Sequence, residues 1–98
     1  MAMFLVTVRR DGPQWDHARP IEGQDAFAEH VAFLTELLDA GLILLGGPLE
    51  DDRVIYVAQA EAADEVASAF ARDPWEGPLV RLETVEPWTV RLDGTRRY

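Results

Sequence analysis

His30 and the tripeptide Asp73-Pro74-Trp75 hold the residue types of this chain that are best suited to proton transfer. The chain has only two histidines, and His30 lies among apolar residues that recur at helical spacing. A histidine moves protons readily near neutral pH, and a carboxylate bonded to one ring nitrogen can fix its tautomer. If the fold joins His30 to Asp73, the two can form an acid/base dyad. The alternative is a partly buried histidine bonded to an aspartate for structural reasons alone.

Four segments that could position these residues have the composition of β-strands. Residues 3–9 alternate in the way that favours a strand, and residues 42–45 form a short continuous apolar run. Residues 53–60 are rich in valine, isoleucine and tyrosine, which favour strands. Residues 79–90 predict a last strand, with a break or bulge at Pro87.

Two segments have the spacing of helices. Asp25 is the predicted N-cap of the first helix, which runs to about Ala40 and stops at Gly41. Its predicted core positions are Phe27, Val31, Leu34, Leu37 and Leu38. The second helix is predicted from Ala62 to about Arg72, and Pro74 keeps Asp73 out of helical geometry. The core side of this helix is predicted to hold Ala62, Val66, Ala69 and Phe70.

The order of elements is therefore β-α-β-β-α-β, in a single domain that spans residues 1–98. It predicts an α+β ferredoxin-like fold, an antiparallel sheet with both helices on one face. In that topology the start of the first helix, the end of the second and the polar loop 10–23 lie at one end of the sheet. We therefore expect His30 and Asp73 to meet there, beside a hairpin turn at residues 46–48. Residues 93–98 are predicted to be a polar tail.

The strands are apolar on both sides, although two helices can cover only one face of a sheet. A second copy of the same sheet is the simplest cover, so we expect a homodimer packed through its sheet faces. The competing explanations are a monomer with an exposed apolar patch and a different protein partner.

Composition excludes several classes of chemistry. The chain has no cysteine, which excludes disulfides and thiolate chemistry, and all nine basic residues are arginine, which removes Schiff-base chemistry through lysine. The net charge of −9 argues against a nucleic-acid partner. We see neither a signal peptide nor a membrane-spanning segment, so we expect a cytoplasmic protein with no membrane partner.

An ordered set of motifs resembles the YciI-like (YCII-related) family over nearly the whole chain. The set consists of His30 before an apolar helix, Gly41 with an apolar strand, Gly47-Pro48, Asp73-Pro74-Trp75, Gly77 and Val85-Glu86-Pro87-Trp88. The resemblance implies a dimeric α+β barrel, a ferredoxin-like fold that dimerises through its sheets. It also implies that the family's catalytic histidine and aspartate correspond to His30 and Asp73, and that the reaction resembles that of dehydrochlorinases or other lyases.

One departure from the family concerns charge. Many members have a basic residue shortly before the histidine, whereas residues 25–29 here are Asp-Ala-Phe-Ala-Glu. If that residue binds an anionic substrate, Arg19 or Arg10 from the loop would have to replace it.

Further residues are candidates for substrate binding, each with a simpler alternative. Trp15 and Trp75 could wall an apolar pocket, or Trp75 could be ordinary core packing. Gly47 and Pro48 could let a ligand approach the backbone, or form a plain turn. Arg19 could hold a substrate, or be a surface charge. His17 beside Asp16 is more commonly an exposed loop histidine than a metal ligand, so we expect no metal and no cofactor.

Two hypotheses of function follow. The first is a small enzyme of lyase or isomerase type, in which His30 moves a proton on a small cyclic or aromatic metabolite. The second is a noncatalytic ligand-binding or accessory subunit, in which the His30–Asp73 pair is structural.

Overall fold

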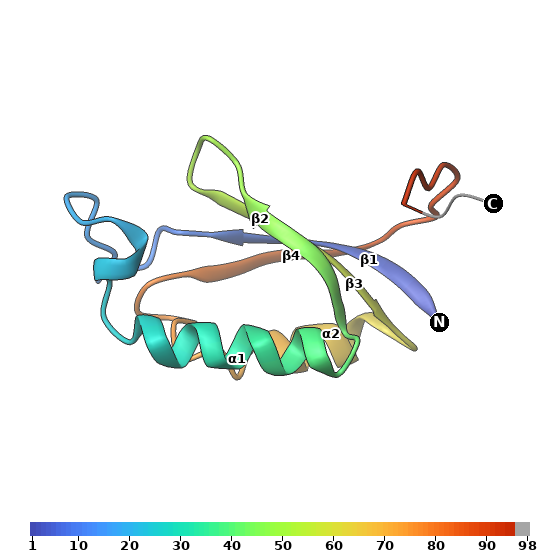
Figure 1. Ribbon diagram of the computed structural model, residues 1–98, viewed down its shortest axis with the longest axis horizontal. Coiled ribbons are helices and arrows are strands. Elements are labelled where there is room, and N and C mark those ends of the chain that lie inside the picture. The colour runs from blue at the N-terminus through green and yellow to red at the C-terminus, as the bar shows by residue number, and fades with distance from the viewer. Residues whose placement is uncertain (96–98) are drawn as a thin grey trace.

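An antiparallel sheet of four strands forms one layer of the computed structural model, and two helices form the other (Figure 1). The structure describes residues 1–95, so the end of the predicted tail at 96–98 lies outside the described residues. The strands are β1 (Ala2–Arg9), β2 (Ile43–Pro48), β3 (Arg53–Ala60) and β4 (Arg81–Pro87). The helices are α1 (Phe27–Asp39) and α2 (Ala63–Phe70), with a short 3-10 helix η1 (Ile21–Gly23) before α1.

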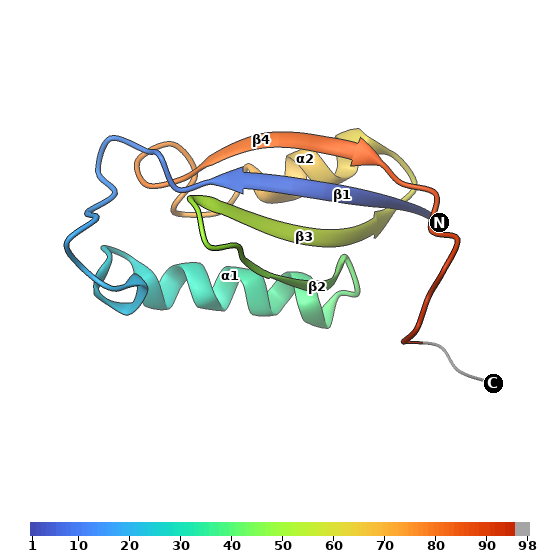
Figure 2. The ribbon, with the colours of Figure 1, turned by 90° about the horizontal axis from the view of Figure 1, so that it is seen from above.

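The strand order is β2-β3-β1-β4, which is visible from above in Figure 2. β1 pairs antiparallel with both β3 and β4, and β2 pairs antiparallel with β3. The predicted ferredoxin-like α+β fold is confirmed, and β3 has the predicted bounds.

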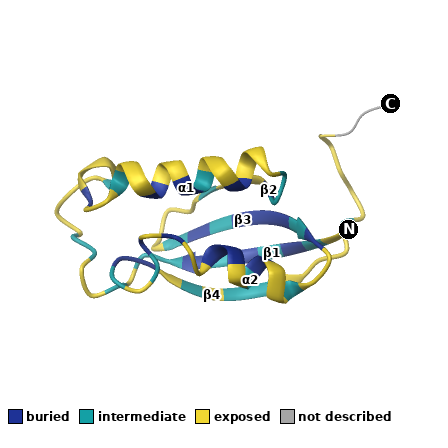
Figure 3. Ribbon diagram, turned by 90° about the horizontal axis from the view of Figure 1, so that it is seen from below, coloured by how far each residue is buried: buried dark blue, intermediate teal, exposed yellow. Residues whose placement is uncertain are grey.

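The core lies between the sheet and the helices. Alternate residues of β1 and β3 face the helices and are buried: Phe4, Val6, Val8, Val54, Tyr56, Ala58 and Ala60. Figure 3 shows the helices from their outer side, with buried stretches interrupting exposed ones along each helix. This period of two on the strands and of three to four on the helices is what one buried face of each element requires.

Helix α1 buries His30, Phe33 and Leu37, which follow one another at spacings of three and four. The prediction was wrong for Val31 and Leu38, which are both exposed. The reason is that the buried stripe of α1 is narrower than the stripe of apolar residues on its surface. His30 therefore occupies a true core position of the helix.

The start of α1 differs from the prediction. Ala26, not Asp25, is the N-cap, and its φ of 58° is in the left-handed region. The carbonyl of Asp25 accepts the indole N–H of Trp75 at 2.6 Å, which places Asp25 one step outside the helix. The predicted stop at the other end is confirmed, because Gly41 follows the helix with a φ of 78°.

Strand β2 extends further than predicted and includes Gly46, Gly47 and Pro48, which pair with Tyr56, Ile55 and Val54 of β3. These residues are therefore not the hairpin turn, which lies at residues 49–52. A Cβ at Gly46 would lie 2.4 Å from Cδ1 of the Tyr56 ring. The strand can continue through this position because glycine leaves room for that ring.

Strand β4 is shorter than predicted at its start. Leu79 and Val80 both donate their backbone N–H groups to the carbonyl of Trp75, so they belong to the bend before the strand. The strand ends at Pro87, where the break was predicted. Helix α2 also ends earlier than predicted, with Ala71 as its C-cap. No helix within residues 1–95 is long and apolar enough to span a membrane.

Candidate active site

His30 and Asp73 are joined by a hydrogen bond of 2.9 Å between Nδ1 and Oδ1. His30 lies near the start of α1, and Asp73 follows the end of α2, so the bond joins the first helix to the turn after the second. The side chains of the pair are 9% and 6% exposed. The topology thus brings together the two residues that the sequence singled out, inside the core rather than on the surface.

The turn after α2 orients the carboxylate of Asp73. Oδ1 also accepts the backbone N–H of Trp75 at 2.9 Å, and the backbone N–H of Asp73 donates to the carbonyl of Phe70. An aspartate that accepts the N–H two residues later forms an Asx turn, which is a local contact of the chain. One oxygen therefore receives two donors, one local and one from α1.

The ring of Trp75 lies flat against the imidazole of His30. The two ring centroids are 3.7 Å apart, and the angle between the planes is 6°. Trp75 is 1% exposed, and its indole N–H is bonded to Asp25. It therefore offers almost no surface to a ligand and acts as a platform that holds the plane of the histidine.

The geometry determines which nitrogen of His30 is available when Asp73 is ionised. A carboxylate only accepts hydrogen bonds, so Nδ1 of the neutral ring must hold the proton, and Nε2 has the free electron pair. Within residues 1–95, every buried side-chain nitrogen or oxygen atom has a hydrogen-bond partner. Since Nε2 has none there, it is not fully enclosed and keeps some contact with solvent. A base with these properties can take a proton from a bound molecule.

Aromatic contacts continue outward from Trp75 to the long loop. Trp15 meets Trp75 edge to face, with ring centroids 5.5 Å apart, and the guanidinium of Arg10 lies 5.3 Å from the centroid of Trp15. The loop is tied to the bend before β4, because Gly12 and Gln14 donate to the carbonyls of Leu79 and Pro78. Trp15 is therefore held against Trp75, the residue that stacks on His30, and Arg10 lies over Trp15.

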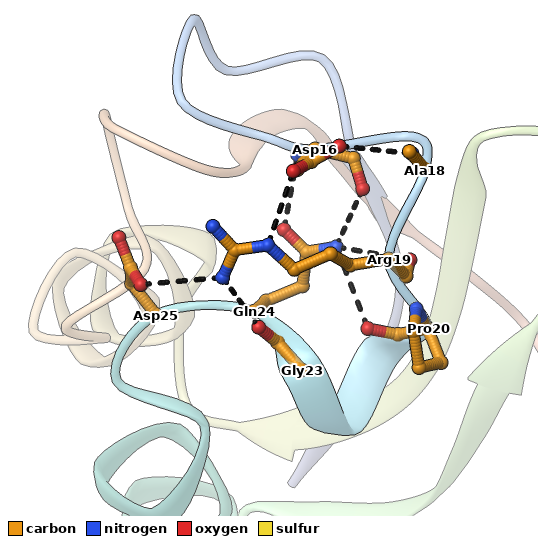
Figure 4. Close-up of polar contacts among 7 residues, drawn as sticks. All are labelled: Asp16, Ala18, Arg19, Pro20, Gly23, Gln24 and Asp25. Carbon is orange, nitrogen blue, oxygen red and sulfur yellow. Dashed lines mark hydrogen bonds and ion pairs between the residues drawn. The ribbon is translucent and has the colours of Figure 1, made fainter.

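Arg19 is engaged within its own loop (Figure 4). Its guanidinium donates to the carboxylate of Asp16 and to the carbonyl of Gly23, and it pairs with Asp25 at 3.7 Å. These contacts favour a structural role over the predicted role in substrate binding.

Gln24 is buried, and its side chain links separate parts of the same loop (Figure 4). The sequence did not indicate this structural role. Its side-chain amide donates to the carbonyls of Asp16 and Arg19 and accepts the backbone N–H of Asp16. The loop at 16–24 is therefore closed by its own hydrogen bonds.

A family model of the YCII-related domain matches residues 3–89. The chain belongs to the YCII-related domain family. A search of curated proteins finds no significant match.

One solved structure resembles this YCII-related domain over nearly its whole length. It is the 5-chloro-2-hydroxyhydroquinone dehydrochlorinase (TftG) from Burkholderia phenoliruptrix AC1100, in complex with 2,5-dihydroxybenzoquinone. The TM-score is 0.59 at 24% sequence identity, and the match covers 97% of this chain and 99% of the dehydrochlorinase chain. At this identity, the likeness supports the fold.

Tyr56 is a polar residue of the YCII-related domain whose sequence context indicates only a strand. It lies on the helix side of β3, and its ring centroid is 5.1 Å from that of Phe70. Burial, and next the negative charge of Asp73, raise the pKa of its hydroxyl to about 12. The signal that could have revealed it is the alternation of β3, in which Tyr56 is the only polar-tipped residue among Val54, Ala58 and Ala60 on the buried side.

The remaining residues that the sequence singled out make no hydrogen bond or ring contact with the dyad within residues 1–95. Gly47 and Pro48 belong to the edge strand β2, and a Cβ at Gly47 would have no atom within 4 Å. His17 is exposed in the loop, and no group of three or more histidine, aspartate or glutamate residues within residues 1–95 could hold a metal ion.

An apolar groove of about 480 Å³ lies away from the dyad, on the face of the sheet that the helices leave open. Its lining includes Met3, Leu45, Val57 and Trp88, together with residues of the segment after β4. Leu45 and Trp88 are exposed.

Proposed function

We propose that this YCII-related domain is a cofactor-free enzyme of lyase or isomerase type that acts on a small cyclic or aromatic compound. The supporting observation is the 2.9 Å bond from Nδ1 of His30 to Asp73, which leaves Nε2 as an accessible base. In this proposal His30 moves the proton, and Asp73 orients the ring and stabilises the imidazolium. That TftG, a protein of the same fold, is a dehydrochlorinase is consistent with it.

The proposed step balances without a cofactor. Nε2 takes a proton from a carbon or hydroxyl group of the ring, and the electron pair of that bond forms a new double bond. In a lyase step, a leaving group such as chloride departs with the electron pair of its bond to the ring carbon. His30 later returns its proton to water. In an isomerase step, the proton returns to a different atom of the same molecule.

The two histidines of the chain provide the test. We would incubate the wild type with chlorinated hydroxyhydroquinones and measure the release of chloride and the ultraviolet spectrum. General acid/base catalysis is worth about 10² to 10⁴ in rate, so His30→Ala should lose about that factor. His17→Ala is the matched control, because His17 is exposed in the loop. Full turnover by His30→Ala would eliminate this mechanism.

A second function is favoured by burial. The pair is only 9% and 6% exposed and packs on a fully buried tryptophan, as a structural pair would. The domain would then be a noncatalytic ligand-binding or accessory subunit. In that case His30→Ala lowers the free energy of unfolding and leaves ligand or partner binding unchanged, and the wild type turns over none of the ring compounds.

We also propose that the domain is a homodimer that packs through the open faces of its sheets. Both helices cover the same face, and the opposite face has an apolar groove with Leu45 and Trp88 exposed. A second copy would remove this apolar surface from water. Sedimentation at micromolar concentration should give a dimer, and Leu45→Glu should shift it toward monomer. A monomeric wild type would contradict the proposal.

A further inference from the structure

The position of Tyr56 is fixed from two sides at the end of the sheet where the dyad lies. Its ring fills the space left by Gly46 on β2 and packs against Phe70 at the end of α2. The carbonyl of Phe70 accepts the backbone N–H of Asp73 at 3.1 Å. The phenol therefore lies beside the turn that orients the carboxylate of the dyad.

The hydroxyl of Tyr56 makes no hydrogen bond within residues 1–95. Because no fully buried side-chain oxygen in this part of the chain lacks a partner, the hydroxyl keeps some contact with solvent. A buried tyrosine usually bonds its hydroxyl within the protein. Here a rigidly held ring presents an unbonded polar atom near the turn that carries Asp73.

Two charges of opposite sign act on the pKa of this hydroxyl. Burial and then the charge of Asp73 raise the pKa of Tyr56 to about 12, while the positive charge of Arg10 acts in the opposite direction. At neutral pH the phenol is protonated and can donate a hydrogen bond. A hydrogen-bond donor thus interacts with the carboxylate of the dyad and with a nearby cation.

Arg10 differs from several neighbouring arginines in having no carboxylate partner within residues 1–95. Arg9, Arg19, Arg53 and Arg81 each pair with an aspartate or glutamate in the structure. The guanidinium of Arg10 instead lies over the ring of Trp15, which leads through Trp75 to His30. Its positive charge is therefore available to an anion at the site, in a chain whose net charge is −9.

We propose that Tyr56 is a substrate-binding residue of the dyad site, and that its hydroxyl donates to an anionic ring oxygen that Arg10 also attracts. The substrate class is then a small ring compound with an ionised hydroxyl group. This inference rests on the proposed function for the location of the site, and it adds the charge of the substrate and the groups that recognise it.

The test measures binding without turnover. The probe is 2,5-dihydroxybenzoquinone, whose hydroxyl groups are acidic, and its dissociation constant is measured by calorimetry at neutral pH. A hydrogen bond to a charged group is worth about one to two powers of ten in affinity, so Tyr56→Phe should bind about 10- to 100-fold more weakly. Arg10→Gln should also bind about 10-fold more weakly. Arg91→Gln, which makes the same change of charge on the exposed segment after β4, should bind as the wild type does.

A neutral analogue separates recognition of charge from recognition of shape. 2,5-Dimethoxybenzoquinone cannot ionise, so wild type and Tyr56→Phe should bind it with equal and low affinity. Thermal unfolding of Tyr56→Phe should match that of the wild type at neutral pH, since the hydroxyl has no partner to lose within the described residues. A large loss of thermal stability would indicate a structural hydroxyl and overturn the proposal.

Other results also overturn the inference. The first is that the wild type does not bind the probe. The second is that Tyr56→Phe and the wild type bind it with equal affinity. The third is that Arg91→Gln and Arg10→Gln weaken its binding equally. The proposed function fails separately, if His30→Ala retains full turnover while Tyr56→Phe still weakens binding. The two proposals can therefore be distinguished.

Discussion

The indole of Trp75 and the imidazole of His30 are parallel, with ring centroids 3.7 Å apart. The stack fixes the plane of the histidine, and the bond from Nδ1 to Asp73 fixes its rotation within that plane. Trp75 is held in turn by its indole N–H on the carbonyl of Asp25, just before α1. The orientation of Nε2 therefore depends on the turn after α2 and on the residue that precedes the cap of α1.

The tautomer of His30 is the most direct consequence of this geometry. With Asp73 ionised, the neutral ring should hold its proton on Nδ1, and Asp73→Asn should weaken this preference because an amide can also donate. Long-range proton–nitrogen correlation spectra distinguish the two tautomers. His17 is the internal control, because its loop position gives no reason for the same preference. A wild-type His30 protonated on Nε2 in the neutral ring would contradict the assigned geometry.

The two adjacent glycines of β2 should respond differently to alanine. A Cβ at position 46 would lie 2.4 Å from Cδ1 of Tyr56, whereas one at position 47 would have no atom within 4 Å. Gly46→Ala should therefore cost about 1–3 kcal/mol of the free energy of unfolding, and Gly47→Ala should be neutral or slightly stabilising. Urea denaturation of both variants gives the comparison. Equal effects would mean that the Tyr56 ring is not fixed against Gly46.

Two adjacent leucines of α1 provide a similar test of the core. Leu37 is 3% exposed and Leu38 is 50% exposed, although the sequence predicts both as core residues. Leu37→Ala should cost about 2–5 kcal/mol because it leaves a cavity, and Leu38→Ala should cost less than about 1 kcal/mol. Denaturant titrations report both values. A larger cost at Leu38 would place α1 in a different rotation on the sheet.

Tyr56 should make stability depend on pH in the alkaline range. Its pKa is raised from 10.0 to about 12, so between these values the folded protein binds more protons than the unfolded chain. The free energy of unfolding should then fall by about 1.4 kcal/mol for each pH unit from about pH 10 to about pH 12. Tyr56→Phe removes this contribution. Parallel curves for wild type and Tyr56→Phe above pH 10 would contradict the raised pKa of Tyr56.

Local patterns were sufficient to predict most of the fold. Residues 53–60 were predicted with their observed bounds because their composition is that of a strand, and Gly41 ends α1 as predicted. The meeting of His30 and Asp73 followed from the order of elements and the antiparallel topology. Each of these inferences needs only local spacing and the few topologies that such an order allows.

The remaining differences come from contacts between distant residues. Asp25 is not the N-cap because the indole of Trp75 takes its carbonyl, and Gly46 remains in a strand because it faces the ring of Tyr56. Arg19 is bound by its own loop, and the sequence does not show which loop oxygens it meets. Tyr56 was missed because its open hydroxyl is visible only when its surroundings are known.

The Asx turn at Asp73 has a consequence for how the dyad forms. Oδ1 binds the N–H of Trp75 two residues away, so the carboxylate is oriented as soon as the turn after α2 closes. The distant His30 then meets an acceptor whose rotamer is already chosen, and little further side-chain entropy is lost when the bond forms. Preorganisation of this kind is a property of the folded chain itself.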